Sequence, residues 1–413
     1  MDAQPPSPAP GAMPRGKFSS LPRNIWVLGF ASLFMDTSSE MIHGLLPVFL
    51  VGSLGVSALT LGLIEGIAEA TASISKIFSG ALSDRWAKRK PLIVAGYAMA
   101  ALSKPLFPLA NSALTVFVAR FIDRIGKGIR GAPRDALVAD LTPASVRGAA
   151  FGLRQALDSV GAILGPLVAI VAIGYFAGDF RAAFWLAIPP AVLCVALLCI
   201  GVREADDRAA RAPDVNAKLS WRDVRRLDRR FVIVTVIASV LTLARFSEAF
   251  LVLRGQGVGL GTLGAPWVMV AMTVVYAACA LPAGRLADRG HAKALLSAGA
   301  AALIASDVVL AFAANTAGVL VGAGLWGLHM ALTQGLLAAL VAATAPPDLR
   351  GTAFGVFGLA CGVALLVASA LAGYLWQAIG PSATFIAGAT FAGIAWMALA
   401  LQLRDVPTLD VAR

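Results

Sequence analysis

The sequence has little charge for its length. Lys, Arg, Asp and Glu make up 14% of the 413 residues, and hydrophobic residues make up 58%. Soluble globular proteins carry about 25% charged residues, and a membrane-spanning helix needs about 20 predominantly apolar residues. Runs of that length recur from one end of the chain to the other, and the mean hydropathy is +0.80. These values argue against a soluble globular fold and predict an all-α membrane protein.

Cysteine is scarce as well. The four cysteines lie in apolar runs and are too scattered for a metal cluster, so we expect reduced thiols. Residues 1–23 are rich in proline and lack the apolar segment of a signal peptide, which predicts a disordered tail. No stretch resembles a hydrolase or a nucleotide-binding domain, so we expect neither enzymatic activity nor a bound cofactor.

The net charge of +11 is distributed unevenly along the chain. Basic residues gather in alternate loops, at Arg85–Lys90 and nine times within Arg203–Arg230, while the loops near 51–59 and 377–382 carry no charge. This alternation follows the positive-inside rule. It predicts that both termini are cytoplasmic, and it argues against nucleic acid as a partner.

Twelve apolar segments are long enough to span a bilayer. They cover residues 24–51, 59–81, 91–110, 113–137, 149–176, 181–201, 231–253, 264–283, 293–313, 316–343, 352–375 and 382–403. We therefore predict a first bundle over 24–201, a cytoplasmic linker over 202–230, a second bundle over 231–403 and a cytoplasmic tail over 404–413.

The two predicted bundles are internal repeats. The stretch GALSDRWAKRK, which begins at Gly80, recurs as GRLADRGHAK from Gly284, an offset of 204 residues. The stretch PASVRGAAFG from Pro143 recurs as PPDLRGTAFG from Pro346, at an offset of 203. Two repeated six-helix halves are typical of many secondary transporters. The expected fold is therefore twelve transmembrane helices in two pseudo-symmetric six-helix bundles.

Charge within the apolar spans is concentrated in the first half. The stretch ARFIDRIGKGIRGAPRDALVAD (Ala119–Asp140) carries eight charged side chains. A charge at the bilayer centre costs ~2.5–3.5 kcal/mol on insertion scales, so each charge needs a partner or a water-filled cavity. Spans one to five, with Asp140 just beyond the end of the fourth included, hold eight basic and eight acidic residues, and this neutral sum favours mutual pairing. The alternative is that part of the set lines a cavity and binds substrate.

Several of these motifs resemble the major facilitator superfamily of secondary transporters, and the resemblance covers the whole chain. Gly80, Asp84 and Arg85, with the basic run to Lys90, are similar to a signature loop of that family. Arg120, followed by two glycines, resembles its fourth-helix motif. The wider stretch DRIGKGIRGAPRDALVAD resembles a prokaryotic subgroup whose substrates are mostly unassigned. The resemblance implies alternating access about a central cavity.

The same resemblance implies roles for two further sets of residues. A fifth-helix pattern associated with antiporters, in which glycines allow close helix packing, is matched at Gly152, Gly161, Gly165 and Pro166. The closing glycine pair of that pattern is absent, since Ala169 and Ile170 stand there. A latch on the cytoplasmic side in the outward-facing state is implied for Asp84, Arg85, Arg89, Asp288 and Arg289.

Acidic residues within the spans are candidates for proton coupling, because a carboxylate paired with a cation can exchange that cation for a proton. Asp36 and Glu40 are the first candidates, and Glu69 and Asp158 the second. The predicted substrate cavity draws on both halves: Arg120, Lys127, Arg130, Arg134, Glu248, Trp326, His329 and Gln334. We expect a proton-coupled exporter (antiporter) of small organic molecules that is driven by the proton gradient.

Two other functions stay open. Lys127, Arg130 and Arg134 favour a proton-coupled carrier of an anionic metabolite. His43 and His329 would suit a soft metal, but a metal or siderophore transporter is the least favoured alternative because no Cys/His cluster accompanies them. The expected partners are a small-molecule substrate and the lipid bilayer, and we expect a monomer in the bacterial inner (cytoplasmic) membrane.

Overall fold

The computed structural model describes residues 21–85, 89–143, 146–202, 226–346 and 349–402. These residues form helices and turns, and no strand occurs among them. The predicted tails, apart from a few residues next to the helices, and most of the predicted linker lie outside the described residues. In a bilayer every backbone N–H and C=O must find its partner within the protein, and a helix achieves this within one segment. The predicted all-α fold is confirmed.

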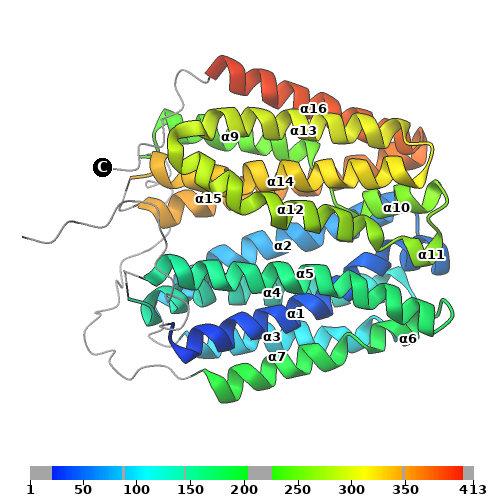
Figure 1. The fold of residues 1–413 in the computed structure, drawn as a ribbon, viewed down its shortest axis with the longest axis horizontal. Coiled ribbons are helices and arrows are strands. Elements are labelled where there is room, and N and C mark those ends of the chain that lie inside the picture. The colour runs from blue at the N-terminus through cyan, green and yellow to red at the C-terminus, as the bar shows by residue number, and fades with distance from the viewer. Residues whose placement is uncertain (1–20, 86–88, 144–145, 203–225, 347–348, 403–413) are drawn as a thin grey trace, which may run out of the picture.

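The helices fall into two groups (Figure 1). The first group consists of α1 (Arg23–Val48), α2 (Ala58–Arg85), α3 (Lys90–Ser103), α4 (Ala113–Leu141), α5 (Arg147–Tyr175), α6 (Phe180–Trp185) and α7 (Ile188–Gly201). The second group consists of α9 (Arg229–Ala244), α10 (Ala249–Gly257), α11 (Gly261–Gly264), α12 (Trp267–Leu286), α13 (Ala292–Phe312), α14 (Thr316–Thr344), α15 (Arg350–Ala378) and α16 (Pro381–Gln402).

The long helices run side by side along the molecule, with α7 ending and α9 beginning on the left of Figure 1. We call this end the linker end, because α7 ends and α9 begins there, and we call the opposite one the far end. Large apolar side chains such as Leu102, Ile200 and Leu401 are 75%, 81% and 82% exposed on the outside of the helices. Such an apolar exterior suits contact with lipid.

The helices repeat as the sequence predicts. α14 and α15 each contain 29 residues, as do α4 and α5, and each begins 203 residues after its counterpart. The caps repeat too. The Ser112 side chain accepts a hydrogen bond from the backbone N–H of Thr115 at the start of α4, and Asn315 accepts one from Gly318 at the start of α14. A polar cap of this kind satisfies an N–H that the first turn leaves without a partner.

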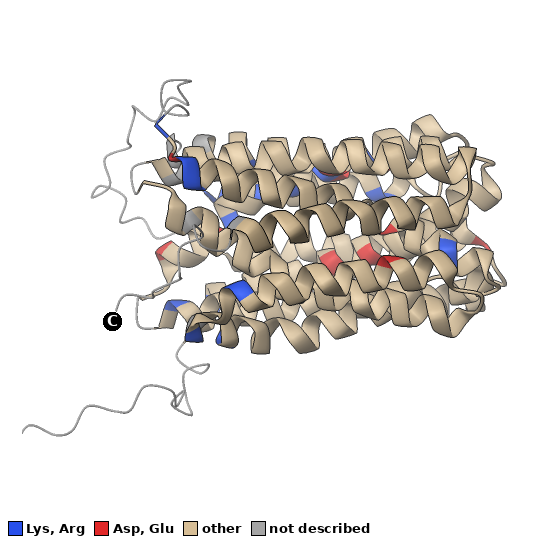
Figure 2. Ribbon diagram, turned by 90° about the horizontal axis from the view of Figure 1, so that it is seen from above, with Lys and Arg blue, Asp and Glu red and all other residues tan. Residues whose placement is uncertain are grey.

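Eight helical segments within the described residues, all from α5 onward, are long and apolar enough to cross a membrane by length and composition. The four helices before them do not meet this criterion. α3 contains only 14 residues and gives way to a 3-10 turn at Lys104–Leu106, whereas α1, α2 and α4 carry charged side chains at mid-length. Figure 2 shows acidic and basic segments within the bundle as well as at its ends.

The seventh predicted span, 231–253, is two helices in the structure. α9 ends at Ala244 and α10 begins at Ala249. The N–H of Ser247, which lies in the break, donates to Ser369 Oγ of α15 at 3.1 Å, so the break does not leave this donor unpaired. Hydropathy predicted a single span because neither Gly nor Pro marks the interruption.

Candidate functional site

A central cavity of about 420 Å³ lies between the two groups of helices. The first group supplies most of the wall, and among the described residues α12 supplies the rest through Thr273 and Tyr276. The lining residues of α2, α4 and α5 lie between mid-length and the linker end. Toward the far end α1 packs against the second group, since a Cβ added at Gly44 would lie 3.4 Å from Pro266 Cβ. The cavity therefore extends toward the linker end.

Charges of both signs line this cavity. The acidic lining residues are Asp36, Glu40, Glu69, Asp135 and Asp158. The basic lining residues are Lys76, Lys127, Arg130 and Arg134. All four residues predicted for proton coupling are thus in the wall, as are three of those predicted for substrate binding. Their roles in transport stay predictions, whereas their placement is a structural result.

Two glycines of α5 set the position of the first-helix acids. A Cβ added at Gly161 would lie 2.6 Å from the Leu33 carbonyl oxygen, and one added at Gly165 would lie 2.6 Å from Glu40 Cβ. Glycine at these positions lets α5 approach the backbone of α1 directly. The prediction of close packing is wrong for Gly152, where no atom lies within 4 Å of an added Cβ. Pro166 is buried within α5, beside the same contact.

The glycines of the fourth helix serve the same purpose. A Cβ added at Gly126 would meet the backbone of α3, 3.1 Å from Ala100 N, and one added at Gly128 would lie 2.7 Å from the Ala72 oxygen of α2. Lys127 stands between these two glycines and is exposed in the cavity. The close packing of α4 against α2 and α3 therefore leaves the Lys127 side chain facing the cavity.

Three ion pairs tie α4 to α2 and α3 in the interior. Arg120 pairs with Glu65, Arg124 Nη1 lies 3.1 Å from Glu69 Oε1, and Lys104 Nζ lies 2.9 Å from Asp123 Oδ1. Except for Glu69, which borders the cavity, these side chains are at most 5% exposed. Removing one partner would leave a buried charge without compensation. Arg120 does not line the cavity, so its prediction as a substrate-cavity residue is wrong.

A second charged cluster lies nearer the linker end. Arg134 Nη1 donates to Ser32 Oγ at 2.5 Å and to the Tyr97 hydroxyl at 3.1 Å, and the Arg130 guanidinium lies 4.4 Å from the centre of the Tyr97 ring. Arg154 Nη1 lies 3.3 Å from both Asp135 Oδ1 and Asp158 Oδ2. These contacts hold several cavity-lining groups in place.

Three cavity charges stand apart from these clusters. In the described part of the chain, no oppositely charged group lies within 4 Å of Asp36, Lys76 or Lys127. Lys76 and Lys127 are exposed, and Asp36 is partly buried. The two sequence-based interpretations therefore hold for different residues: some charges of the first half pair internally, and others face the cavity.

Four residues that the sequence predicted for the cavity wall, all from the second half, do not line it: Glu248, Trp326, His329 and Gln334. Trp326 is fully buried against Phe246, with ring centroids 5.4 Å apart. His329 is also buried, and its Nδ1 lies 2.9 Å from the Gly299 carbonyl oxygen. Hydropathy identified the helix but not which of its faces turns to the other half.

Other lining residues were absent from the predicted set, among them Lys76, Gln155, Ser159 and Thr273. Lys76 follows Glu69 by seven residues and so lies on the same face of α2, which was a usable signal. The small polar side chains gave no such signal, because single Ser, Thr and Gln residues also occur in membrane helices as internal hydrogen-bond donors.

The predicted latch is described in part. Arg89 Nε lies 2.8 Å from Asp140 Oδ2 at the end of α4, so this contact is made within the first half. Arg289 is exposed. The side chains of Asp84, Arg85 and Asp288 lie outside what the structure describes. The latch between the halves stays a prediction.

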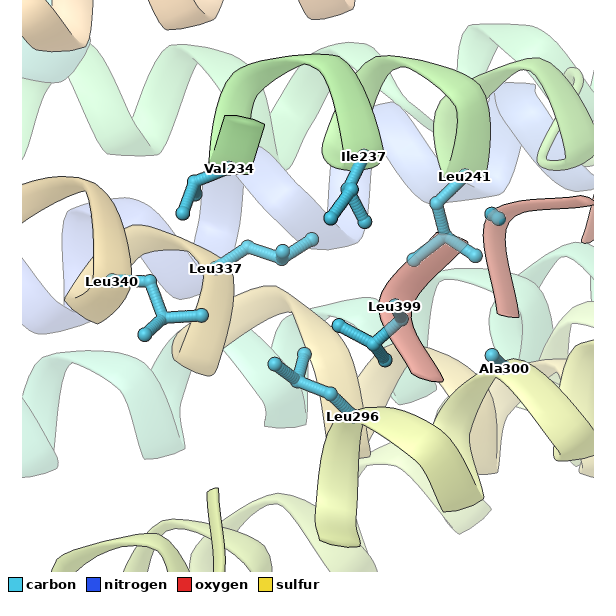
Figure 3. Close-up of a pocket in the computed structure, with 9 residues that line it drawn as sticks. Val234, Ile237, Leu241, Leu296, Ala300, Leu337, Leu340 and Leu399 are labelled. Carbon is cyan, nitrogen blue, oxygen red and sulfur yellow. The ribbon is translucent and has the colours of Figure 1, made fainter. Parts of the chain in front are cut away.

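A second pocket lies inside the second group of helices (Figure 3). Its wall is entirely aliphatic and comes from α9, α13, α14 and α16, with Ile237, Leu296 and Leu337 pointing into it. No polar side chain lines it. It lacks the groups that would orient a polar ligand or carry a proton, so we regard the charged central cavity as the candidate site.

The sequence was compared with families and known proteins. A family model described as Major Facilitator Superfamily matches residues 28–265 and 249–412. An uncharacterised MFS-type transporter of Methanocaldococcus jannaschii is 31% identical over 386 residues, which cover 92% of this chain and 94% of that one. Multidrug resistance protein MdtH of Yersinia pestis is 31% identical over 160 residues, 39% of each chain.

The solved structure of a POT family transporter in complex with a thioalcohol-conjugated peptide is similar in fold. The TM-score is 0.80 at 13% sequence identity, and the match covers 94% of this chain and 99% of that one. At this level of identity the likeness concerns the arrangement of the helices and not the ligand.

Proposed function

The chain belongs to the major facilitator superfamily, and from this premise we propose that it is a proton-coupled exporter (antiporter) of small organic molecules. Membership makes it a multi-pass membrane protein and a secondary transporter of a small-molecule substrate. The proposal adds the direction, the coupling to protons and the class of substrate. The partial similarity to a multidrug resistance protein supports export.

The observation that carries the proposal is the position of Asp36. It lies ~20 Å along α1 from Arg23, at mid-length of the helix, and it borders a cavity large enough for a small organic molecule. A carboxylate that faces water there, without a fixed cation, is free to bind either a proton or a positively charged group of a substrate. Competition between the two would couple their movements. Glu40, Glu69 and Asp158 are the other proposed proton carriers.

Transport in vesicles tests this proposal. Inside-out vesicles with an acidic interior should accumulate ethidium, and adding nigericin to collapse the pH gradient should abolish the accumulation. Asp36→Asn should reduce it to the level of empty vesicles. Asp179→Asn is the matched control, because Asp179 caps α6 outside the cavity. Accumulation that ignores the gradient, or an Asp36→Asn variant equal to the parent, would contradict the proposal.

A specific observation favours a second function, a proton-coupled carrier of an anionic metabolite. Lys76 and Lys127 present two ammonium groups to the cavity, and neither has an ion-pair partner within the described residues. If the substrate is anionic, Lys127→Gln should abolish accumulation of carboxyfluorescein in the same vesicles. If the substrate is a cation, the variant should accumulate ethidium at least as well as the parent, because a repelling charge has been removed.

We further propose that the linker end faces the cytoplasm of a bacterial inner membrane, with both termini on that side. The alternation of basic and uncharged loops supports this orientation. The central cavity would then be open toward the cytoplasm, and closing it would bring together the loops that carry the proposed latch residues Arg89 and Arg289. Labelling of cysteines introduced at the two ends, from either side of intact cells, tests the orientation.

A further inference from the structure

His43 of α1 lies at the meeting point of three helices. Its Nδ1 is 3.4 Å from Glu40 Oε2 on the same helix, and its Nε2 is 3.5 Å from Glu65 Oε2 on α2. The same Nε2 is 3.3 Å from Nη2 of Arg120 on α4, which itself pairs with Glu65. Both ring nitrogens therefore face charged groups.

This arrangement accommodates two protonation states without moving a heavy atom. When His43 is neutral, Nε2–H donates to Glu65, and Nδ1 carries no proton and faces Glu40, from which it can take one up. When His43 is charged, both nitrogens donate, one to Glu40 and the other to Glu65. In the charged state Nε2–H and the guanidinium share the Glu65 carboxylate. A site that accepts either state with small rearrangement is suited to taking up and releasing a proton.

The charge balance of the cluster favours such a step. Glu40, Glu65 and Arg120 together carry one net negative charge when His43 is neutral, and none when it is protonated. The side chains of Glu65 and Arg120 are 1% and 4% exposed, that of His43 is 11% exposed and that of Glu40 is 23% exposed. A net charge in such surroundings is costly, and a proton on His43 removes it.

Other charges act on this site from the neighbouring helices. Lys127 and Arg124 of α4 act on Glu40, and Glu248, which precedes α10 in the second half, is subject to both His43 and Glu40. From α5, Gly165 packs against Glu40 and brings no charge. A shift of the second half would move Glu248 relative to His43, so the affinity of His43 for a proton would differ between conformations.

We propose that His43 is the relay that passes a proton between the cavity and the buried Glu65–Arg120 pair. The proton enters at Glu40, the member of the cluster that lines the cavity, and reaches Nδ1 of His43. The ring then donates through Nε2–H to Glu65, which Arg120 also holds. His43 thereby converts proton binding in the cavity into a changed contact between α1, α2 and α4. The transport role rests on the proposed proton coupling, whereas the proton site can be measured without transport.

Nitrogen NMR of the full chain in lipid bilayers, with ¹⁵N-labelled histidine, tests the proton site directly. The chain has three histidines, so His43→Gln assigns the signals of His43 by their disappearance. We expect His43 to pass from neutral to charged between about pH 10 and pH 5, toward the upper part of this range because its neighbours carry a net negative charge. In the neutral state we expect the proton on Nε2, because Nε2 faces the Glu65 carboxylate and Nδ1 must be unprotonated to receive a proton from Glu40. Signals of His43 that stay unchanged over this range would overturn the proposal.

Vesicle transport separates the relay from the wider function. His43→Gln should lose the accumulation of ethidium that depends on the pH gradient, while His329→Gln, a matched change at a buried histidine outside the cluster, should retain it. A His43→Gln variant that folds and keeps the pH dependence of the parent would refute the relay. If the parent itself ignores the gradient, the proposed antiport fails, and the NMR titration still decides whether His43 takes up a proton.

Discussion

Asp123→Asn removes the charge that faces Lys104. The geometry of the pair gives the expected decrease in the free energy of unfolding. Lys104 Nζ lies 2.9 Å from Asp123 Oδ1, and the two side chains are 2% and 5% exposed. At this separation the Coulomb attraction is ~6 kcal/mol for an effective dielectric constant of 20. Much of it offsets the cost of removing both charges from water. Breaking such a pair by removing one partner costs ~3–5 kcal/mol, which is the loss we expect.

Removing the other partner of the pair, by Lys104→Met, should lower the free energy of unfolding less. After Lys104→Met, Asp123 still has a cation nearby, because Arg124 Nε lies 3.7 Å from its Oδ2. After Asp123→Asn, Lys104 keeps a neutral partner among the residues that the structure describes, the Ser39 hydroxyl at 2.9 Å. We therefore expect Lys104→Met to lower the free energy of unfolding by ~1–3 kcal/mol. The double variant should be less destabilised than the sum of the two, by about 2 kcal/mol.

Unfolding of the purified chain in mixed micelles, followed by circular dichroism during an SDS titration, measures these differences. Asp140→Asn is the control, since it removes an ion pair whose side chains are 18% and 30% exposed and should cost no more than ~1 kcal/mol. If Asp123→Asn lowers the free energy of unfolding no more than this control does, or if the effects of the two single changes are additive, the Lys104–Asp123 pair does not stabilise the first half.

Three further outcomes follow from the same structure. In thermal unfolding, Gly165→Ala should lower the free energy of unfolding by ~1–3 kcal/mol, because the added Cβ would lie 2.6 Å from Glu40 Cβ of α1. Gly152→Ala should leave this free energy unchanged or raise it slightly, because no atom lies within 4 Å of the added Cβ. Ser112→Ala and Asn315→Ala each remove a helix cap and should each lower the unfolding free energy by ~1 kcal/mol, measured by SDS titration; no loss would show that water replaces the caps. Lys127→Gln should leave stability within ~0.5 kcal/mol of the parent, because the side chain is exposed; a larger loss would indicate a structural pair.

The fold was predictable because hydropathy and repetition are properties of the chain itself. Apolar runs of spanning length located the twelve spans, and the offset of 203 residues related α4 to α14 and α5 to α15. The break between Ala244 and Ala249 was not predictable in this way. It depends on the contact of Ser247 with α15, which is distant in sequence.

The site was predictable only to the level of a helix face. Arg120 and Lys127 are seven residues apart, so they lie on nearly the same face of α4, ~10 Å apart along its axis. The Arg120 side chain is 4% exposed and pairs with Glu65, whereas Lys127 is exposed in the cavity. The difference arises from how α2 packs against α4 at each depth. Helical spacing alone does not contain that information, which is why the predicted set included Arg120.

The repeat also relates charged positions of the first half to apolar positions of the second. At the offset of 203 residues, three charged residues of α4 correspond to apolar residues of α14. Asp123 corresponds to Trp326, Lys127 to Met330 and Arg134 to Leu337. Leu337 lines the aliphatic pocket of Figure 3, so the same backbone position supports a charged cluster in one half and an apolar core in the other. The second half therefore depends mainly on apolar burial and van der Waals packing, whereas the first depends also on ion pairs.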